Sequence, residues 1–296
     1  MPGCAAPFQS SRLKSWYAKL FHNGYLLRDP ALTEHHTIEQ IRAFWQQQAI
    51  EFGQSPAASW SDRYVIKMEV AEILERLQDG DRVLDVGCGN GFSTVQFASQ
   101  KHIDILGEDY IPEMIEQAKR RFAKLDGRLA GKVSFGIGDV TALEHQSNSF
   151  DKVVAIRVII NLGEWTNQLR GITECARVLK PGGLLLLSEA TLQGWRKLNA
   201  FRNEWGMPDI PMPPFNNYLD EHLVVDETSA LLQLVALVNF ASSYYVGTRV
   251  LKPLLIQALG VAIEAGNPDL HWNRWFSTLP SFGDYGTQKL FILRKR

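Results

Sequence analysis

The sequence has 296 residues, of which 45% are hydrophobic and 21% charged, so it carries enough apolar material for a sizeable core and is not expected to be disordered. A formal net charge of -1 argues against a polyanion-binding surface, and we expect no nucleic-acid partner. No apolar run reaches membrane-spanning length, so we expect no membrane partner. The three cysteines lack metal-ligand spacing, which favours a reduced, cytoplasmic protein without a disulfide framework or a metal site.

The chain opens with residues 1–62, which we expect to form a helical cover for a main domain at 63–296. The first predicted helix of that domain ends at Asp79-Gly80 and is recognised from apolar residues at helical spacing: Ile66, Val70, Ile73, Leu74 and Leu77.

Short apolar runs and helical patterns then alternate along the chain. Strands are predicted at residues 83–86, 103–106, 133–137, 152–156 and 184–188. Helices are predicted at 92–99, at 165–179 and from Pro112 onward, the last with one apolar face made of Ile115, Ala118, Phe122 and Leu125. Two later runs, 238–245 and 289–293, are expected to pair as strands near the far edge. This order predicts an α/β fold, a Rossmann-like, seven-stranded, mostly parallel sheet with helices on both faces.

Two aromatic-rich and proline-containing insertions, residues 190–225 and 247–286, interrupt the alternation. Small-molecule sites are mostly apolar, so the insertions are interpreted as a lid and an acceptor pocket, with Trp205 and Tyr218 as substrate-side candidates. A packing cover over the sheet edge or a homodimer surface is the alternative.

A glycine-rich turn follows the first predicted strand. Gly87, Gly89 and Gly91 allow the backbone to approach a ligand closely, because no Cβ stands in the way. The dinucleotide fingerprint G-x-G-x-x-G needs a third glycine at position 92, where this chain has Phe92. The spacing therefore disfavours a nicotinamide-dependent oxidoreductase.

Acidic residues stand at or near the ends of three predicted strands: Asp85, Asp109 and Asp139. Taken alone, an aspartate at such a position forms a turn or a loop cap about as often as it binds a ligand. Together they converge, because the carboxyl ends of parallel strands share one crevice. Asp85 suits a cationic amino group, Asp109 is placed for the ribose hydroxyls, and Asp139, with the Val140 backbone, for an adenine amino group.

Five segments in this order resemble the class I S-adenosylmethionine-dependent methyltransferases, especially the branch acting on small molecules and on quinone or sterol precursors. They are VLDVGCGNG from Val83, ILGEDYIPEMIEQAKRR from Ile103, VSFGIGDV from Val133, FDKVVAIRVIINL from Phe150 and RVLKPGGLLLLSEA from Arg177. The resemblance implies S-adenosylmethionine as the cofactor and a transfer of its methyl group.

The resemblance also implies roles for individual residues. The cofactor-binding set it implies is Asp85, Gly87, Cys88, Gly89, Gly91, Asp109, Tyr110, Asp139, Val140, Ile156 and Arg157. Between the adjacent acids Glu108 and Asp109, strand alternation and the family register favour Asp109 for the ribose. The Ile156-Arg157 backbone is expected near the methionyl amine, while the Arg157 side chain is open to substrate contact, ion pairing or neither.

The sulfonium already favours transfer, so the protein mainly aligns the acceptor and excludes water, and a general base is optional. Candidates for a base or a substrate contact are Glu189, His222 and Asn161. We expect methylation of an oxygen or nitrogen of a small organic metabolite. The alternative is a non-catalytic subunit or regulator of the same fold that binds the nucleoside.

Overall fold

The computed structural model describes residues 36–125 and 129–296. The chain divides into two units, Met1–His35 and His36–Arg296, and only the second contains described residues. The predicted cover at 1–62 therefore lies partly outside the described residues, and its boundary stays a prediction. Its described part contains helix α2 (Ile38–Phe52) and the short 3-10 helix η1 (Pro56–Ala58).

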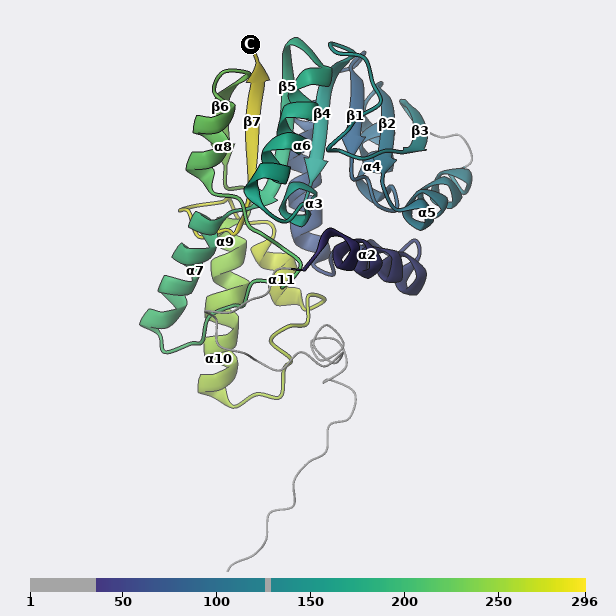
Figure 1. The fold of residues 1–296 in the computed structure, drawn as a ribbon. Coiled ribbons are helices and arrows are strands. Elements are labelled where there is room, and N and C mark those ends of the chain that lie inside the picture. Colours follow the sequence, from purple (N-terminus) through teal and green to yellow (C-terminus); the bar gives the residue numbers. More distant parts are fainter. Residues whose placement is uncertain (1–35, 126–128) are drawn as a thin grey trace, which may run out of the picture. The chain divides into compact units, whose positions relative to one another are not determined.

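The predicted seven-stranded, mostly parallel sheet is confirmed (Figure 1). Its strands are β1 (Arg82–Val86), β2 (Asp104–Asp109), β3 (Lys132–Ile137), β4 (Phe150–Ile156), β5 (Leu179–Ala190), β6 (Leu232–Val238) and β7 (Gln288–Lys295). They are ordered β3-β2-β1-β4-β5-β7-β6. Strands β1 to β5 pair in parallel, and β7 is antiparallel to both β5 and β6.

One predicted strand is wrong. Residues 238–245 do not form a strand, since β6 ends at Val238 and Ser242–Tyr245 form helix α9. Asn239 follows the last residue of β6, and its side-chain amide donates to Asp284 Oδ1. Tyr244 and Tyr245 are both buried, and the Tyr244 hydroxyl donates to Asp62. Packing against a distant segment thus outweighs the β propensity of this run.

The helices that follow the sheet strands match their predicted positions closely: α4 (Phe92–Gln100), α5 (Pro112–Ala123) and α6 (Trp165–Val178). Helix α3 (Arg63–Leu74) ends before the predicted Asp79-Gly80, although Leu77 beyond it is still buried. On α5 the predicted apolar face is broken, because Phe122 is 38% exposed.

Both faces of the sheet carry a core, because successive strand residues point to opposite sides. Val83, Ile105 and Leu186 pack in one cluster, which includes residues of α3 and α4. Leu84, Val153 and Leu185 pack in the other, which includes residues of α6 and of α8 (Glu221–Thr228). No helix in the described ranges is both long and apolar enough to cross a membrane.

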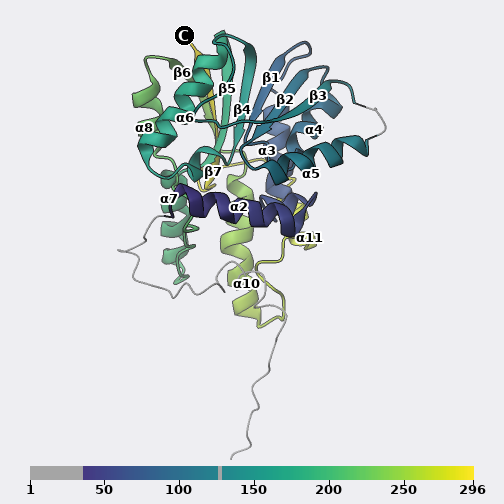
Figure 2. The ribbon, with the colours of Figure 1, turned by 45° about the vertical axis from the view of Figure 1, so that its right-hand side comes forward.

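The two insertions contain helix α7 (Leu192–Glu204), the π-helix η3 (Val246–Leu251), α10 (Lys252–Leu259) and α11 (His271–Phe276). In both ribbon views α2, α7, α10 and α11 lie at the edge where the parallel strands end (Figures 1 and 2).

A buried lysine ties both insertions to the last strand. Lys289 of β7 is 2% exposed, and its Nζ lies 2.8 Å from Glu221 Oε1 and 2.5 Å from Asp284 Oδ1. Thr191 donates to the same oxygen of Glu221, at 2.7 Å. Residues of both insertions thus share one cation at the end of β5.

Candidate functional site

The glycine turn after β1 has the backbone that its sequence predicts. Gly87, Gly89 and Gly91 have φ angles of 63°, 55° and 70°, in the left-handed region that favours glycine. The spaces beside them differ. A Cβ on Gly87 would lie 2.2 Å from a methyl group of Val158, whereas a Cβ on Gly89 would meet nothing within 4 Å. Gly89 is therefore the glycine with an open side, and Gly87 is a packing position.

Two of the predicted acids are buried beside this turn. Asp85 is 2% exposed and accepts a 2.5 Å hydrogen bond from the Thr94 hydroxyl. Burial raises the pKa of Asp85 to about 7, although the Thr94 hydrogen bond opposes the shift. Asp109, at the end of β2, is 7% exposed and accepts from the Gly89 and Ile111 N–H groups, each at 2.9 Å. Burial also raises the pKa of Asp109, to about 6.

The neighbouring acid, Glu108, points to the other side of the sheet. Its Oε1 lies 3.0 Å from His145 Nε2.

We expect Asp109→Asn to weaken S-adenosylhomocysteine binding by about 1.5–3 kcal/mol, because it removes charge-assisted hydrogen bonding at the end of β2. Glu108→Gln, the matched control, is expected to cost much less. Isothermal titration of both variants decides the assignment, and the reverse ranking would move the ribose contact to Glu108.

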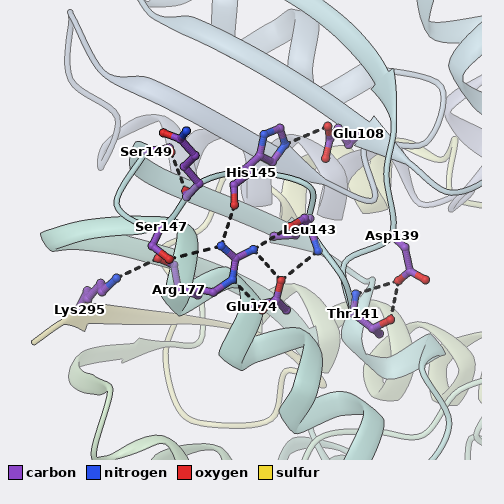
Figure 3. A network of polar contacts seen from close by, with 11 residues as sticks. Glu108, Asp139, Thr141, Leu143, His145, Ser147, Ser149, Glu174, Arg177 and Lys295 are labelled. Atoms are coloured by element: carbon purple, nitrogen blue, oxygen red, sulfur yellow. Dashed lines mark hydrogen bonds and ion pairs between the residues drawn. The ribbon is translucent and has the colours of Figure 1, made fainter.

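The third acid, Asp139, is exposed and forms a local turn. Its Oδ1 accepts from the Thr141 N–H and hydroxyl groups, both at 2.8 Å. Arg177 of α6 fixes the following loop by donating to the carbonyl oxygens of Leu143 and His145, each at 2.7 Å (Figure 3). Asp139 thus has the turn-forming geometry that is common for aspartate, and its adenine contact stays a prediction. Val140 beside it is buried.

Tyr110 directly follows the end of β2 and packs against residues of α2. It packs with Trp45, Phe52 and Met114 around a small apolar cluster. The Arg42 guanidinium lies 5.7 Å from its ring centroid. Burial raises the pKa of Tyr110 to about 12, so its hydroxyl stays protonated. The ring is therefore held by α2 and α5, next to Asp109.

A strap formed by residues 53–60 closes over the glycine turn. The Asn90 amide donates to the carbonyl oxygens of Gly53 and Ser55, each at 2.8 Å. Arg121 of α5 donates to the carbonyl oxygens of Asn90 and Gln54. The cavity beneath the strap has about 40 Å³ and is lined by residues that include Asp85, Gly87 and Arg157. This volume is smaller than the roughly 300–1,000 Å³ of a typical small-molecule site.

Arg157 follows β4 in a left-handed conformation, with φ of 55°. Its guanidinium pairs with Glu69 of α3, which is fully buried, and lies 4.9 Å from the Trp60 ring centroid. The Asn161 amide donates to the Arg157 carbonyl oxygen at 2.7 Å. Of the three open roles for Arg157, the structure shows ion pairing.

Neither predicted base lines this cavity. Glu189 is fully buried, and its Oε1 accepts from the Val158 and Ile159 N–H groups at 2.8 and 2.7 Å. Burial raises the pKa of Glu189 to about 8. This geometry supports a structural role in holding the 3-10 turn η2 (Ile159–Asn161). His222 is exposed in the first turn of α8. The catalytic role of both residues stays a prediction.

The first insertion reaches back to the N-terminal helix. Phe215 stacks on Phe44 of α2, with ring centroids 4.3 Å apart, and the Asn217 N–H donates to the Ile160 carbonyl oxygen. Tyr218 lies edge-on to Trp195, whereas Trp205 is 60% exposed at the end of α7. This part of the insertion therefore lies over the turn after β4, with Trp205 away from it on the surface.

Sequence reasoning missed Glu69, Asn90 and Arg121. Glu69 offered a signal, because it lies beside Val70 and three positions after Ile66, both of which are buried. An acid among buried positions needs a partner. Asn90 and Arg121 offered no such signal in the sequence, since their acceptors are backbone oxygens of a loop.

A larger open hollow of about 600 Å³ lies beside α6, lined by Thr141, Arg170 and Glu174 among others, and it includes none of the predicted cofactor residues.

Comparisons with known proteins place this site in a class. Residues 83–183, about a third of the chain, match the family described as "Methyltransferase domain". This stretch thus matches a methyltransferase domain, which agrees with the S-adenosylmethionine-dependent class that its sequence motifs resemble.

Three curated relatives show how far the similarity extends. The O-methyltransferase rstn1 of Aspergillus nomiae is 34% identical over 47% of this chain and 63% of its own. The 27-O-demethylrifamycin SV methyltransferase of Amycolatopsis mediterranei is 33% identical over 39% of this chain and 41% of its own. The ubiquinone/menaquinone biosynthesis C-methyltransferase UbiE of a Geobacter species is 31% identical over 38% of this chain and 47% of its own. The chain thus spans between 41% and 63% of the length of these relatives.

Solved structures share the fold over most of the chain. The [4+2]-cyclase SpnF has a TM-score of 0.56 at 22% identity and covers 88% of this chain and 97% of its own. Phosphoethanolamine N-methyltransferase 1 of Haemonchus contortus, solved with phosphoethanolamine and S-adenosylhomocysteine, has a TM-score of 0.55 at 17% identity, covering 89% and 51%. At these identities the likeness shows the fold alone.

Proposed function

We propose that the protein transfers the methyl group of S-adenosylmethionine to an oxygen or nitrogen atom of a small organic metabolite. The observation that carries this proposal is the buried pair Asp85 and Asp109 on either side of a left-handed glycine turn. The relatives support a small-molecule acceptor, although their names include both O- and C-methyltransferases. That the methylated atom is an oxygen or a nitrogen is therefore part of the proposal.

The residues present fit this cofactor. Gly89 offers open space beside the backbone, and the unpartnered Nε of Arg157 is a buried donor at the methionine end of the predicted site. Asp85 would face the ammonium group and Asp109 the ribose hydroxyls. The bound cofactor supplies an electrophilic methyl group. The chain's own task is to align the acceptor with it and to keep water out.

The proposal is tested by titrating the purified protein with S-adenosylmethionine, S-adenosylhomocysteine and NAD. We expect the first two to bind and NAD not to bind. Binding of NAD alone would overturn the assignment. A screen of phenols, hydroxylated polyketides and amines with labelled S-adenosylmethionine then tests transfer.

The two buried acids predict a pH dependence. A cationic ligand favours their ionised forms, so at pH 6 binding has to expel the proton that Asp85, with a pKa of about 7, still holds. At pH 8 the group is already ionised. We therefore expect S-adenosylmethionine to bind more tightly as the pH rises from 6 to 8, by up to about tenfold per unit for one linked proton. S-adenosylhomocysteine carries the same ammonium group and should show the same trend, whereas 5'-methylthioadenosine, which lacks this group, should respond less. Equal pH dependence of S-adenosylhomocysteine and 5'-methylthioadenosine would show that Asp85 does not face the ammonium group.

The first insertion is proposed to form the acceptor side of the site. Its stacking on α2 and its contact with the turn after β4 support this role. We expect Tyr218→Ala to depress turnover of an identified acceptor while S-adenosylhomocysteine binding stays within a few fold. Trp205→Ala, at an exposed position, is the matched control. Equal turnover of both variants would leave the insertion without a substrate role.

A non-catalytic cofactor-binding role is the second candidate. It is favoured by the positions of Glu189 and His222, since neither lines the cavity beside Asp85. Methyl transfer does not require a base, so the two candidates differ only in whether labelled methyl reaches any acceptor.

A further inference from the structure

Glu69 of α3 lies at the centre of a buried polar network. Its side chain is fully buried and accepts from the Ser188 hydroxyl at 2.5 Å and from the Gln288 amide at 3.1 Å. Its other oxygen pairs with Arg157. Glu69 thus joins α3, the end of β4, β5 and β7, and it fixes the Arg157 guanidinium from one side.

Arg157 is fixed from other sides as well. Its N–H donates to the Ser188 carbonyl oxygen at 2.9 Å, and its guanidinium lies over the Trp60 ring. A non-glycine residue in the left-handed region persists only where its surroundings hold it. Nevertheless, its Nε is buried without a hydrogen-bond partner among the described residues. Buried donors are nearly always satisfied, so this N–H is available to an acceptor atom of a ligand.

The cavity beside this group has a specific charge pattern. Among the described residues that line it, Arg157 is the only cation and Asp85 the only anion. A carboxylate and a guanidinium on the walls of one small cavity complement the ammonium and carboxylate groups of an α-amino acid.

We propose that Arg157 binds the carboxylate of the methionine portion of the cofactor and that Glu69 is the positioning residue that orients it. This inference rests on the proposed function and adds two residues to it. The arginine distinguishes ligands that carry an amino-acid end from nucleosides that lack one. Its planar fork suits a carboxylate better than a lysine would.

The test compares S-adenosylhomocysteine with 5'-methylthioadenosine, which keeps the nucleoside and the thioether but lacks the amino-acid end. Both are titrated into the full chain by calorimetry. Arg157→Gln is expected to weaken S-adenosylhomocysteine binding about 10- to 100-fold and to leave methylthioadenosine within about twofold, as for the loss of one charge-assisted contact. Glu69→Gln should shift the same ratio in the same direction by a smaller factor.

Two variants serve as controls. Asp109→Asn should weaken both ligands alike, because both contain the ribose, and Arg120→Gln on the surface of α5 should change neither. If Arg157→Gln does not fold, Arg157→Lys replaces it, with a smaller loss expected in the same ligand alone. Equal weakening of both ligands by the Arg157 variant overturns the carboxylate assignment, and equal weakening by Glu69→Gln overturns its positioning role. Failure of the unmodified protein to bind S-adenosylhomocysteine would instead contradict the proposed function.

Discussion

Replacing Gly87 with alanine is expected to destabilise the protein by about 2–5 kcal/mol, measured by denaturant titration. The left-handed backbone costs about 1–2 kcal/mol with a Cβ, and overpacking adds about 1–3 kcal/mol. The overpacking arises because the new Cβ would lie 2.2 Å from Val158 Cγ2. The intrusion is therefore into Val158, rather than into the ligand space that the sequence suggested for a substitution here.

Gly89→Ala is the matched control. Its φ of 55° imposes the same kind of strain, yet its Cβ meets nothing within 4 Å. We expect a loss of only about 1–2 kcal/mol in unfolding free energy, measured by denaturant titration, with weaker ligand binding. Val158→Ala combined with Gly87→Ala should recover part of the lost stability. If Gly87→Ala and Gly89→Ala are equally stable, the packing role of Gly87 is wrong.

Replacing Lys289 with methionine is expected to lower the unfolding free energy by about 3 kcal/mol. Removing one partner of a buried ion pair typically costs about 3–5 kcal/mol, because the remaining charge is left uncompensated. The low end applies here, since the Asp284 side chain is 41% exposed and water can screen it. Despite the opposing effect of burial, hydrogen bonds from Lys197, Lys289 and Asn239 lower the pKa of Asp284 to about 2, and two of these donors, Lys197 and Asn239, remain in the variant.

Lys197→Met provides the comparison. Lys197 pairs with the same aspartate but is 53% exposed, so its loss should cost less than about 1 kcal/mol. Hydrogen exchange should show faster opening of 192–204 and 277–286 in the Lys289 variant alone, since it holds both insertions. Equal stabilities of the two variants would mean that the insertions are held by their apolar contacts.

The sequence by itself determined the order of strands and helices in the core, the glycine turn and the positions of Asp85 and Asp109. These features depend on local periods, on the conformational freedom of glycine and on a general rule that parallel strands end at one edge. Only the tertiary structure decided that Glu69 meets Arg157, 88 positions away, and that Asn90 fastens the strap. It also decided that Glu189 accepts from the Ile159 N–H in the interior and that residues 242–245 form a helix. Such pairings depend on which distant segments pack together, and a residue's own neighbours in the chain do not encode them.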